Sequence, residues 1–374
     1  MKIKPFKVEE WMNEYEDKAK YNIAETCVYS ISLSELFEII DEDITEFWER
    51  FSNRRLTYGD IVGKPNFLNG VTRLYKNIKP ENIIPTHGGA GANSLVISTI
   101  VEPGDHVISV IPTYQQLYSI PESLGADVSL LKLKKDDGYL PDLDTLRTMI
   151  KENTKLICIN NPNNPTGALM SSEMLMEIVE IARSVDAYIL CDEVYRHLNQ
   201  EDIYIESIAD LYEKGIGVSS MSKVFSLAGI RTGWIATRDD DLRTALLTHR
   251  DYNLISCGLF DEEVAAIALN NKDKILARNR KMIIENLAIL DEWVKGEKHI
   301  SYRKPSAGTI TLLHYDIEID SVSFCKDLLE KTGVLLTPGD CFEEPKSLRI
   351  GYASDTQELI DGLEKLSAYI KSIE

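Results

Sequence analysis

Hydrophobic and polar positions change their period along the chain, and this change separates two regions. Between about residues 80 and 249, short β-branched runs alternate with longer amphipathic stretches such as Ser171–Val185, where apolar residues recur at helical spacing. Alternation of this kind is typical of βαβ units, so it predicts an α/β fold with a mostly parallel sheet covered on both faces. The predicted strands are His106–Ile111, Asp127–Leu133, Lys155–Asn160, Ala187–Cys191, Ile216–Ser220 and Trp234–Thr237.

The pattern changes after about Asp261, where a long helical stretch runs over Asp261–Lys298. The later predicted elements are strands near Thr309–His314 and Leu348–Tyr352 and a helix from Thr356. This order is typical of a smaller α+β domain, and 374 residues exceed the usual size of one domain. The sequence therefore predicts a large domain over residues 46–255 and a small domain made of residues 1–45 and 256–374.

The chain is strongly acidic, with a formal net charge of −19. Nucleic acids and anionic membranes are bound by clustered lysine and arginine, so this charge argues against both partners. Six cysteines without CxxC spacing favour reduced thiols over a disulfide framework or a metal site. No apolar run has the length of a signal-peptide core or a membrane span. We therefore expect a cytoplasmic protein that binds no metal.

Lys223 is the most informative residue, because hydroxyl groups surround it where a predicted strand ends. Ser220 lies three residues before the lysine and Arg231 eight residues after it. Hydroxyls, an amine and a guanidinium together can hold a phosphate and present a nucleophilic lysine that forms a Schiff base with a carbonyl compound. For this segment taken alone, a solvated surface lysine is the alternative.

A glycine-rich segment, Thr86–Asn93, precedes a helix predicted at residues 94–101. Its backbone N–H groups and the helix N-terminus suit a phosphate, and a plain glycine-rich turn is the alternative. No Gly-Lys-Ser/Thr follows, which excludes a P-loop. The segment Gly89-x-Gly91-x-x-Ser94 lacks the third glycine of the dinucleotide fingerprint, so an NAD-dependent dehydrogenase is a remote reading.

Further polar residues follow the ends of predicted strands. Asp192 ends an apolar run, and a buried carboxylate is costly unless a cation meets it. It is either a turn or helix-cap residue or a carboxylate that keeps a heteroaromatic nitrogen protonated, and Tyr195 would then face the same ligand. The turn Asn161–Gly167 presents asparagine amides, and Tyr114 either stacks on a flat ligand or lies in the core. Ligands bind at this edge of open α/β sheets, so we expect one shared site.

From Tyr58 to Arg349, the order and spacing of these residues resemble the class I/II aminotransferases, the fold-type I enzymes that depend on pyridoxal 5′-phosphate (PLP). The most specific segments are Asn161–Gly167, Cys191–Tyr195 and Ser220–Arg231. The resemblance implies PLP as the cofactor, a large PLP-binding domain with a smaller mobile one, and a homodimer with shared active sites.

The resemblance also implies a role for each residue that faces the cofactor ring. Lys223 would form the Schiff base and then move the substrate α-proton, while Asp192 would pair with the ring nitrogen. Asn164 and Tyr195 would hydrogen-bond the phenolic oxygen of the ring, and Tyr114 would stack on its face.

The remaining implied roles concern the phosphate and the substrate. Arg349 would grip the substrate α-carboxylate bidentately, with Asn164 beside it, and a surface arginine is the alternative. The residues implied to hold the phosphate are Gly89, Ala90, Gly91, Ser220, Arg231 and Tyr58 of the partner subunit.

One departure concerns substrate recognition. Many members of the family carry a glycine-proline element near the N-terminus that closes over the substrate, and Ala24–Ile31 lacks it. This departure leaves room for an unusual amino acid as the substrate. The implied activity is transfer of an amino group from an L-amino acid to a 2-oxo acid. The alternatives are a β- or γ-lyase, a cyclising eliminase similar to capreomycidine synthase and, remotely, a ligand-binding module without turnover. A decarboxylase is disfavoured, because Arg349 would hold the carboxylate.

Overall fold

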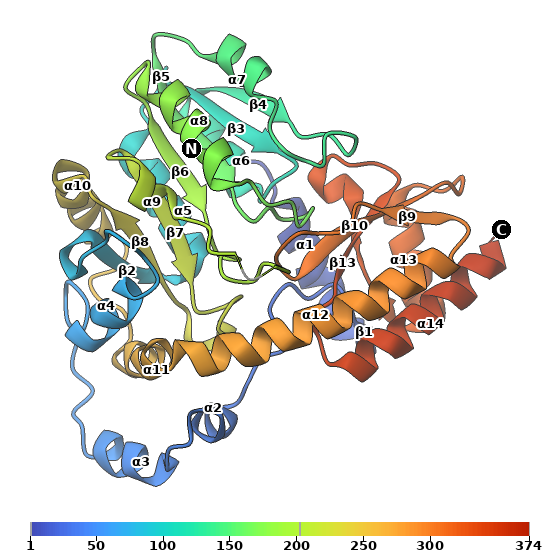
Figure 1. Cartoon of the computed structure of the whole chain (residues 1–374), viewed down its shortest axis with the longest axis horizontal. Helices are drawn as coiled ribbons and strands as arrows, with labels where there is room; N and C mark the ends of the chain where they lie inside the picture. The colour runs from blue at the N-terminus through green and yellow to red at the C-terminus, as the bar shows by residue number, and fades with distance from the viewer. Residues whose placement is uncertain (1, 202, 374) are drawn as a thin grey trace.

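A seven-stranded sheet forms the centre of the chain in the computed structural model, which describes residues 2–201 and 203–373 (Figure 1). The strand order is β2-β8-β7-β6-β5-β3-β4, and only β8 runs antiparallel to its neighbours. This confirms the predicted α/β class with a mostly parallel sheet. The strands are β2 (Ile83–His87), β3 (His106–Ile111), β4 (Asp127–Lys132), β5 (Thr154–Asn160), β6 (Tyr188–Asp192), β7 (Gly215–Ser220) and β8 (Thr232–Thr237).

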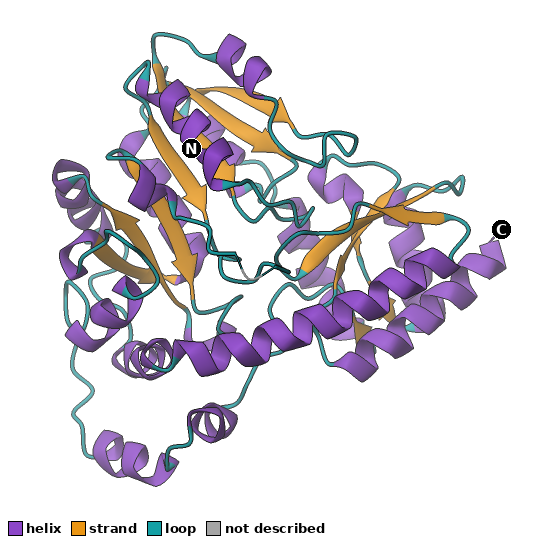
Figure 2. Cartoon of the chain, in the orientation of Figure 1, coloured by secondary structure: helices purple, strands orange, loops and turns teal. Residues whose placement is uncertain are grey.

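Helices cover both faces of this sheet because successive strand residues point to opposite sides (Figure 2). In β5, Ile157 and Ile159 pack into one apolar layer, whereas Leu156 and Cys158 pack into the other. The first layer is completed by α7 (Leu143–Met149), α8 (Ser172–Arg183) and α9 (Ile208–Leu211). The second is completed by α5 (Gly88–Ile100), α6 (Gln116–Leu124) and α10 (Asp240–Arg250).

From Gly88 onward the glycine-rich segment belongs to a helix, so the prediction of a helix start at residue 94 is wrong. Helix α5 begins at Gly88, six residues earlier. A Cβ on Gly233 of β8 would lie 2.5 Å from the backbone carbon of Gly88, so the two backbones pack directly on each other. This tertiary packing overrides the low helix propensity of glycine. Strand β2 lies outside the predicted strands, and its Pro85 is tolerated because β2 is an edge strand.

The long helical stretch predicted over Asp261–Lys298 is two helices rather than one. Helix α11 (Leu259–Asn270) ends before Asn271, whose φ of −112° and ψ of 23° are not helical, and α12 (Lys272–Gly296) follows at once. Asparagine competes for backbone hydrogen bonds and is a weak helix former, which explains the break at this position. Figure 1 shows α12 running from the large sheet to the smaller one.

A second, four-stranded sheet lies in the C-terminal part, with the order β12-β13-β10-β9. The N-terminal segment joins this part, because β1 pairs in parallel with β11. This arrangement is the one expected of a small domain, although the boundaries at residues 46 and 255 stay a prediction, and residues 1 and 374 lie outside the described residues. The strands are β1 (Tyr21–Asn22), β9 (Ile300–Tyr302), β10 (Ile310–Tyr315), β11 (Val334–Leu335), β12 (Thr337–Pro338) and β13 (Ser347–Gly351).

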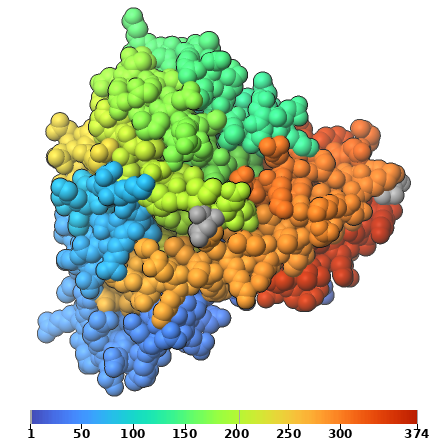
Figure 3. Space-filling model, viewed as in Figure 1, coloured from blue at the N-terminus to red at the C-terminus, as the bar shows by residue number. Residues whose placement is uncertain are grey.

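Of the remaining helices, one (Pro65–Thr72) packs beside the large sheet against α11 and β2, and the others belong to the N-terminal segment or to the C-terminal part. In Figure 3 the segment of residues 33–52, coloured blue, extends below the rest of the molecule. No helix in residues 2–201 and 203–373 is long and apolar enough to cross a membrane. The helices are α1 (Lys7–Tyr15), α2 (Leu33–Ile40), α3 (Ile44–Ser52), α4 (Pro65–Thr72), α13 (Ser321–Thr332) and α14 (Thr356–Ile373), and short 3-10 turns lie at Glu16–Lys18, Pro80–Asn82, Ala228–Ile230 and Gly339–Phe342.

Candidate active site

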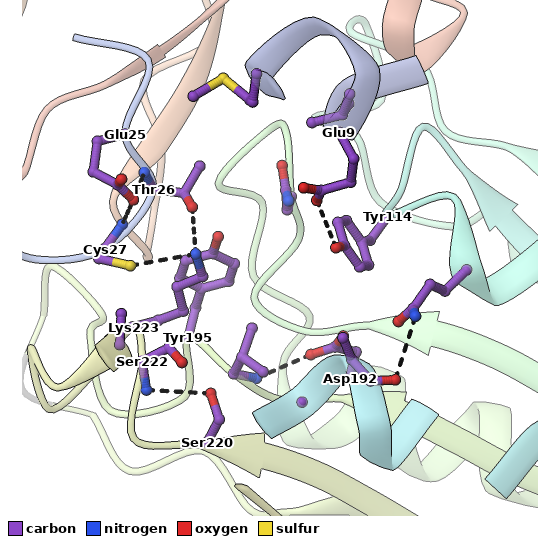
Figure 4. Close-up of a pocket in the computed structure, with 18 of the residues that line it drawn as sticks. Glu9, Glu25, Thr26, Cys27, Tyr114, Asp192, Tyr195, Ser220, Ser222 and Lys223 are labelled. Atoms are coloured by element: carbon purple, nitrogen blue, oxygen red, sulfur yellow. Dashed lines mark hydrogen bonds between the residues drawn. The ribbon is translucent and has the colours of Figure 1, made fainter. Parts of the chain in front are cut away.

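A cavity of about 560 Å³ opens where the central strands end, between the large sheet and the N-terminal segment (Figure 4). It brings together most of the residues that the sequence singles out, from segments far apart in the chain. Gly91 and Tyr58 are not among its lining residues, and Tyr58 is 75% exposed on the surface of the chain. The predicted site residues that line the cavity are Gly89, Ala90, Tyr114, Asn164, Asp192, Tyr195, Ser220, Lys223, Arg231 and Arg349.

Lys223 lies in the cavity wall just after β7 ends. Its Nζ donates a hydrogen bond to the Thr26 hydroxyl and lies 3.4 Å from Cys27 Sγ. Burial opposes a positive charge here, yet the acidic groups of Cys27, Tyr195 and Glu25 outweigh it and raise the pKa of Lys223. The N-terminal segment therefore supplies the immediate partners of this amine, which the sequence did not indicate.

Asp192 is a buried carboxylate at the end of β6, with 4% of its surface exposed. Its Oδ2 accepts a hydrogen bond from Asn93 Nδ2 at 2.8 Å, and its Oδ1 accepts one from the Val194 N–H at 3.2 Å. Burial nevertheless raises the pKa of Asp192. Within the described residues it has no ion-pair partner, so a cationic group from a ligand would stabilise its charged form.

Asn93 ends the glycine-rich segment, but the sequence analysis did not identify it as a site residue. It is 1% exposed, and its Oδ1 has no hydrogen-bond partner among the residues that the structure describes. Its position five residues into α5 follows from the early start of that helix. Only the correct helix boundary would have placed its side chain beside Asp192.

The N-terminus of α5 forms an anion-binding corner with Ser220 and Arg231. His87 makes no side-chain cap, so the first backbone N–H groups of the helix are left for a ligand. The Arg231 guanidinium packs so closely on Gly88 that a Cβ there would lie 2.9 Å from Nη2. Backbone N–H groups, a hydroxyl and a guanidinium meet here, as a phosphate requires.

The asparagine-rich turn after β5 is fastened to the end of β6. Asn160 Nδ2 donates to the Asp192 carbonyl at 2.8 Å, and Asn160 Oδ1 accepts from the Asn164 N–H at 2.6 Å. Asn160 also lines the cavity, which the sequence did not indicate. On the other side, the Tyr114 hydroxyl donates to Glu9 at 2.7 Å, and burial raises the pKa of both Tyr114 and Tyr195.

Arg349 of β13 is 2% exposed, so it is not a surface arginine. Its Nη2 donates to the Ala24 carbonyl and to the Thr337 hydroxyl, both at 3.2 Å, and its Nη1 lies 3.4 Å from Asn164 Oδ1. All of these acceptors are neutral, and burial lowers the pKa of Arg349. A buried guanidinium that meets no carboxylate within the described residues is a fitting partner for the carboxylate of a ligand.

Together, the lysine, the buried acid and the anion-binding helix at the edge of this sheet define the fold-type I class of PLP-dependent enzymes. The chain belongs to the class I and II aminotransferase family, whose sequence model matches residues 39–366. It is therefore an enzyme of this family, and its cofactor is PLP.

Known proteins similar to this chain include aminotransferases and a capreomycidine synthase. A PLP-dependent aminotransferase from Streptococcus suis 89-1591 is 46% identical, with a TM-score of 0.97 over 100% of this chain and 99% of that one. Capreomycidine synthase from Streptomyces vinaceus is 26% identical over 361 residues, which cover 96% of this chain and 92% of that protein. An aspartate aminotransferase from Pyrococcus horikoshii is 28% identical over 83% of this chain and 82% of its own length.

The cavity fits PLP by its own chemistry. Within residues 2–201 and 203–373, Asp192 offers a buried negative charge without an ion-pair partner, and Asn93 beside it has a buried oxygen without a donor. The uncapped start of α5 offers N–H groups to a phosphate. These groups complement a protonated ring nitrogen at one end of the cofactor and a phosphate at the other.

Proposed function

We propose that the chain is an aminotransferase that moves an amino group from an L-amino acid to a 2-oxo acid. The observation that supports this most directly is the meeting of Lys223, Asp192 and Arg349 in one cavity. An amine for the cofactor, an acid for its ring and a guanidinium for the substrate carboxylate are the three groups this chemistry needs.

In this proposal the predicted residues keep their roles around the cofactor. Lys223 would bond the cofactor aldehyde, Asp192 would hold the ring nitrogen, and Tyr114 would cover the ring face. Asn164 and Tyr195 would hydrogen-bond the phenolic oxygen. The phosphate contacts would be the backbone of Gly89, Ala90 and Gly91, the side chains of Ser220 and Arg231, and Tyr58 of the partner subunit.

When bound, the cofactor supplies an electron-accepting ring that weakens the bonds at the substrate α-carbon. Arg349 would hold the α-carboxylate, which places the α-carbon toward Lys223 and keeps the carboxylate from leaving. The Lys223 amine would take the α-proton and return it at another carbon. The Thr26 hydroxyl, a hydrogen-bond partner of that amine, would orient it between these positions.

We further propose a homodimer in the cytoplasm. The loop around Tyr58 is exposed and rich in apolar side chains, with Leu56 80%, Tyr58 75% and Val62 51% exposed. A patch of this kind favours contact with another protein surface. A second copy seated here would bring its own Tyr58 toward the neighbouring cavity.

A panel of L-amino acids, assayed with and without 2-oxoglutarate, tests the proposed activity. We expect the cofactor absorbance to change on addition of a donor alone, and steady turnover to require the 2-oxo acid. Ammonia or a cyclised product formed without any 2-oxo acid would contradict transamination.

Elimination with cyclisation is the second candidate, and one observation favours it. The match to capreomycidine synthase extends over 96% of this chain, which is more than the 83% matched by the aspartate aminotransferase from Pyrococcus horikoshii. The same assay separates the two activities, because a cyclising enzyme or a lyase consumes a substrate that carries a leaving group at Cβ or Cγ without an acceptor.

A further inference from the structure

Three carboxylates from the N-terminal segment line the part of the cavity that the cofactor contacts leave free. Glu9 lies on α1, Glu16 on the following 3-10 turn and Glu25 on the loop after β1. In Figure 4, Glu9 and Glu25 lie above Tyr114 and Lys223, whereas Asp192 and Ser220 lie below. Glu9 and Glu25 therefore lie on the side of the cavity away from Asp192 and Ser220, and Glu16 lines the same cavity.

None of the three carboxylates forms an ion pair with another residue in 2–201 and 203–373. Glu9 accepts a hydrogen bond from the Tyr114 hydroxyl at 2.7 Å, and Glu16 accepts one from Asn22 at 3.3 Å. Glu25 accepts from the N–H groups of its two following residues, at 2.6 and 2.8 Å. Each keeps oxygen capacity for a further donor.

The three acids and Arg349 line the same cavity, and their charges influence one another. Desolvation raises the pKa of Glu16, and the charges of Glu25 and Glu9 raise it further. The same two charges oppose the lowering of the Arg349 pKa by burial. Arg349 is itself 2% exposed, with a buried Nε that has no hydrogen-bond partner. An anchor for a ligand and a group of acids therefore face the same cavity.

A metal site does not explain these acids. Among the described residues, no three histidine, cysteine, aspartate or glutamate side chains are close enough together to hold a metal ion. The Glu25 carboxylate is also turned toward backbone N–H groups, which donate to the same Oε1.

A count of the charges in the proposed complex leaves the acids unpaired. Asp192 is matched by the ring nitrogen, Arg231 by the phosphate and Arg349 by the α-carboxylate, while Lys223 is bonded to the cofactor. Glu9, Glu16 and Glu25 then remain without a cation. Glu9 and Glu25 are half-buried and Glu16 is exposed. Like charges that line one cavity repel one another unless an opposite charge lies among them.

We propose that these glutamates form a subsite for a cationic side chain, so that the substrate is an L-amino acid ending in a guanidinium or an ammonium group. This inference rests on the proposed amino-acid substrate. With the carboxylate on Arg349 and the α-carbon at Lys223, the side chain extends toward the acids. A cation there completes the pairing of charges and gives specificity over neutral side chains of the same shape.

Pairs of amino acids that differ only in side-chain charge test the subsite. We expect the PLP-loaded enzyme to prefer L-arginine over the neutral isostere L-citrulline, and L-lysine over L-norleucine, by about tenfold or more in kcat/KM. Calorimetry on holoenzyme whose lysine–cofactor bond has been fixed with borohydride measures the same preference as dissociation constants, without turnover.

The Glu25→Gln and Glu16→Gln variants, alone and together, test the residues. Glutamine at 25 still accepts the two backbone N–H bonds, so the loop is kept while the charge is lost. We expect the double variant to lose most of the arginine-over-citrulline preference. Glu10→Gln, on the exposed face of α1, is the matched control and should leave the preference unchanged.

The other outcomes overturn either the subsite or the proposed function, and the two failures can be told apart. If the arginine preference persists in the double variant, or if citrulline, norleucine or glutamate bind as well as arginine, the subsite is wrong and the proposed activity stands. If the variants lower kcat/KM and affinity equally for arginine and citrulline, the acids only balance the charges of Lys223 and Arg349, and the subsite is again wrong. If no amino acid changes the cofactor spectrum, the proposed function fails, while calorimetry still decides the subsite.

Discussion

At the scale of single residues, the site consists of charged groups whose burial is explained by a ligand. Asp192 and Arg349 are 4% and 2% exposed, and neither meets an opposite charge within the described residues. A buried charge without a partner costs several kcal/mol, so a protein keeps such groups where a ligand pairs with them. The cavity is thus built for charges that arrive with the cofactor and the substrate.

Replacement of the lysine tests the covalent role. We expect Lys223→Ala to abolish turnover and the adduct that borohydride fixes, because no other lysine among the described residues lines the cavity. Mass spectrometry of the reduced protein measures the adduct. Lys365→Ala, on the exposed face of α14, is the control and should keep both. A single fixed adduct in Lys223→Ala would show that another lysine holds the cofactor.

Replacement of the arginine tests the carboxylate role. We expect Arg349→Gln to lower kcat/KM for the amino-acid donor by about 10²–10³-fold, since a buried charge-assisted pair contributes about 2–4 kcal/mol. A donor amine without a carboxylate should lose much less, because it never contacts Arg349. Equal losses for both donors, measured in the donor half-reaction, would mean that the arginine supports the fold rather than the substrate.

At the scale of elements, α11 carries a buried acid next to the loop that contains Tyr58. Glu262 is 1% exposed, and it accepts a hydrogen bond from the Lys64 N–H at 3.3 Å. Burial raises the pKa of Glu262 to about 7. The contact between α11 and the loop therefore depends on pH through the protonation of this carboxyl.

The pH dependence of stability follows from this shift. The native state holds the Glu262 proton up to about pH 7, whereas the unfolded chain releases it near 4.5, so stability falls as pH rises through this window. We expect Glu262→Gln to remove the effect, and to be more stable than wild type by about 1–3 kcal/mol above pH 7. Urea unfolding of both holoenzymes between pH 4.5 and 8 measures the gap, and parallel curves would contradict the shift.

At the scale of the whole molecule, the N-terminal segment closes the cavity from one side. Strand β1 joins it to the C-terminal part through β11, and α1 reaches the cavity with Glu9. The substrate side is thus built from the two ends of the chain, whereas the cofactor side is built from the central sheet. The exposed Tyr58 lies apart from both.

Mixing two inactive variants tests whether Tyr58 acts across a dimer. In a heterodimer of Tyr58→Ala and Lys223→Ala subunits, one cavity has its own Lys223 and Tyr58 of the partner subunit. Random pairing at equal amounts should then restore about a quarter of the wild-type sites. Activity after unfolding and co-refolding measures the recovery. No recovery, with both variants correctly folded as dimers, would contradict a shared site.

The sequence by itself determined the α/β class, the main strands and most of the cavity. Strand β3 has its predicted bounds, and the residues around Lys223 and Asp192 line one cavity as expected. These features depend on local patterns: apolar periodicity sets the strands, and parallel strands bring their carboxyl ends to one edge. The roles of the individual residues stay predictions, because the structure places them without testing them.

Tertiary structure alone decided the start of α5 and the partners of Lys223. Thr26 contacts an amine 197 residues away, and Asn93 contacts a carboxylate 99 residues away. No local pattern encodes such distances, because they result from how β1 and β11 pair and how α5 packs on the sheet. The substrate wall of Glu9, Glu16 and Glu25 likewise exists only once the N-terminal segment folds back over the cavity.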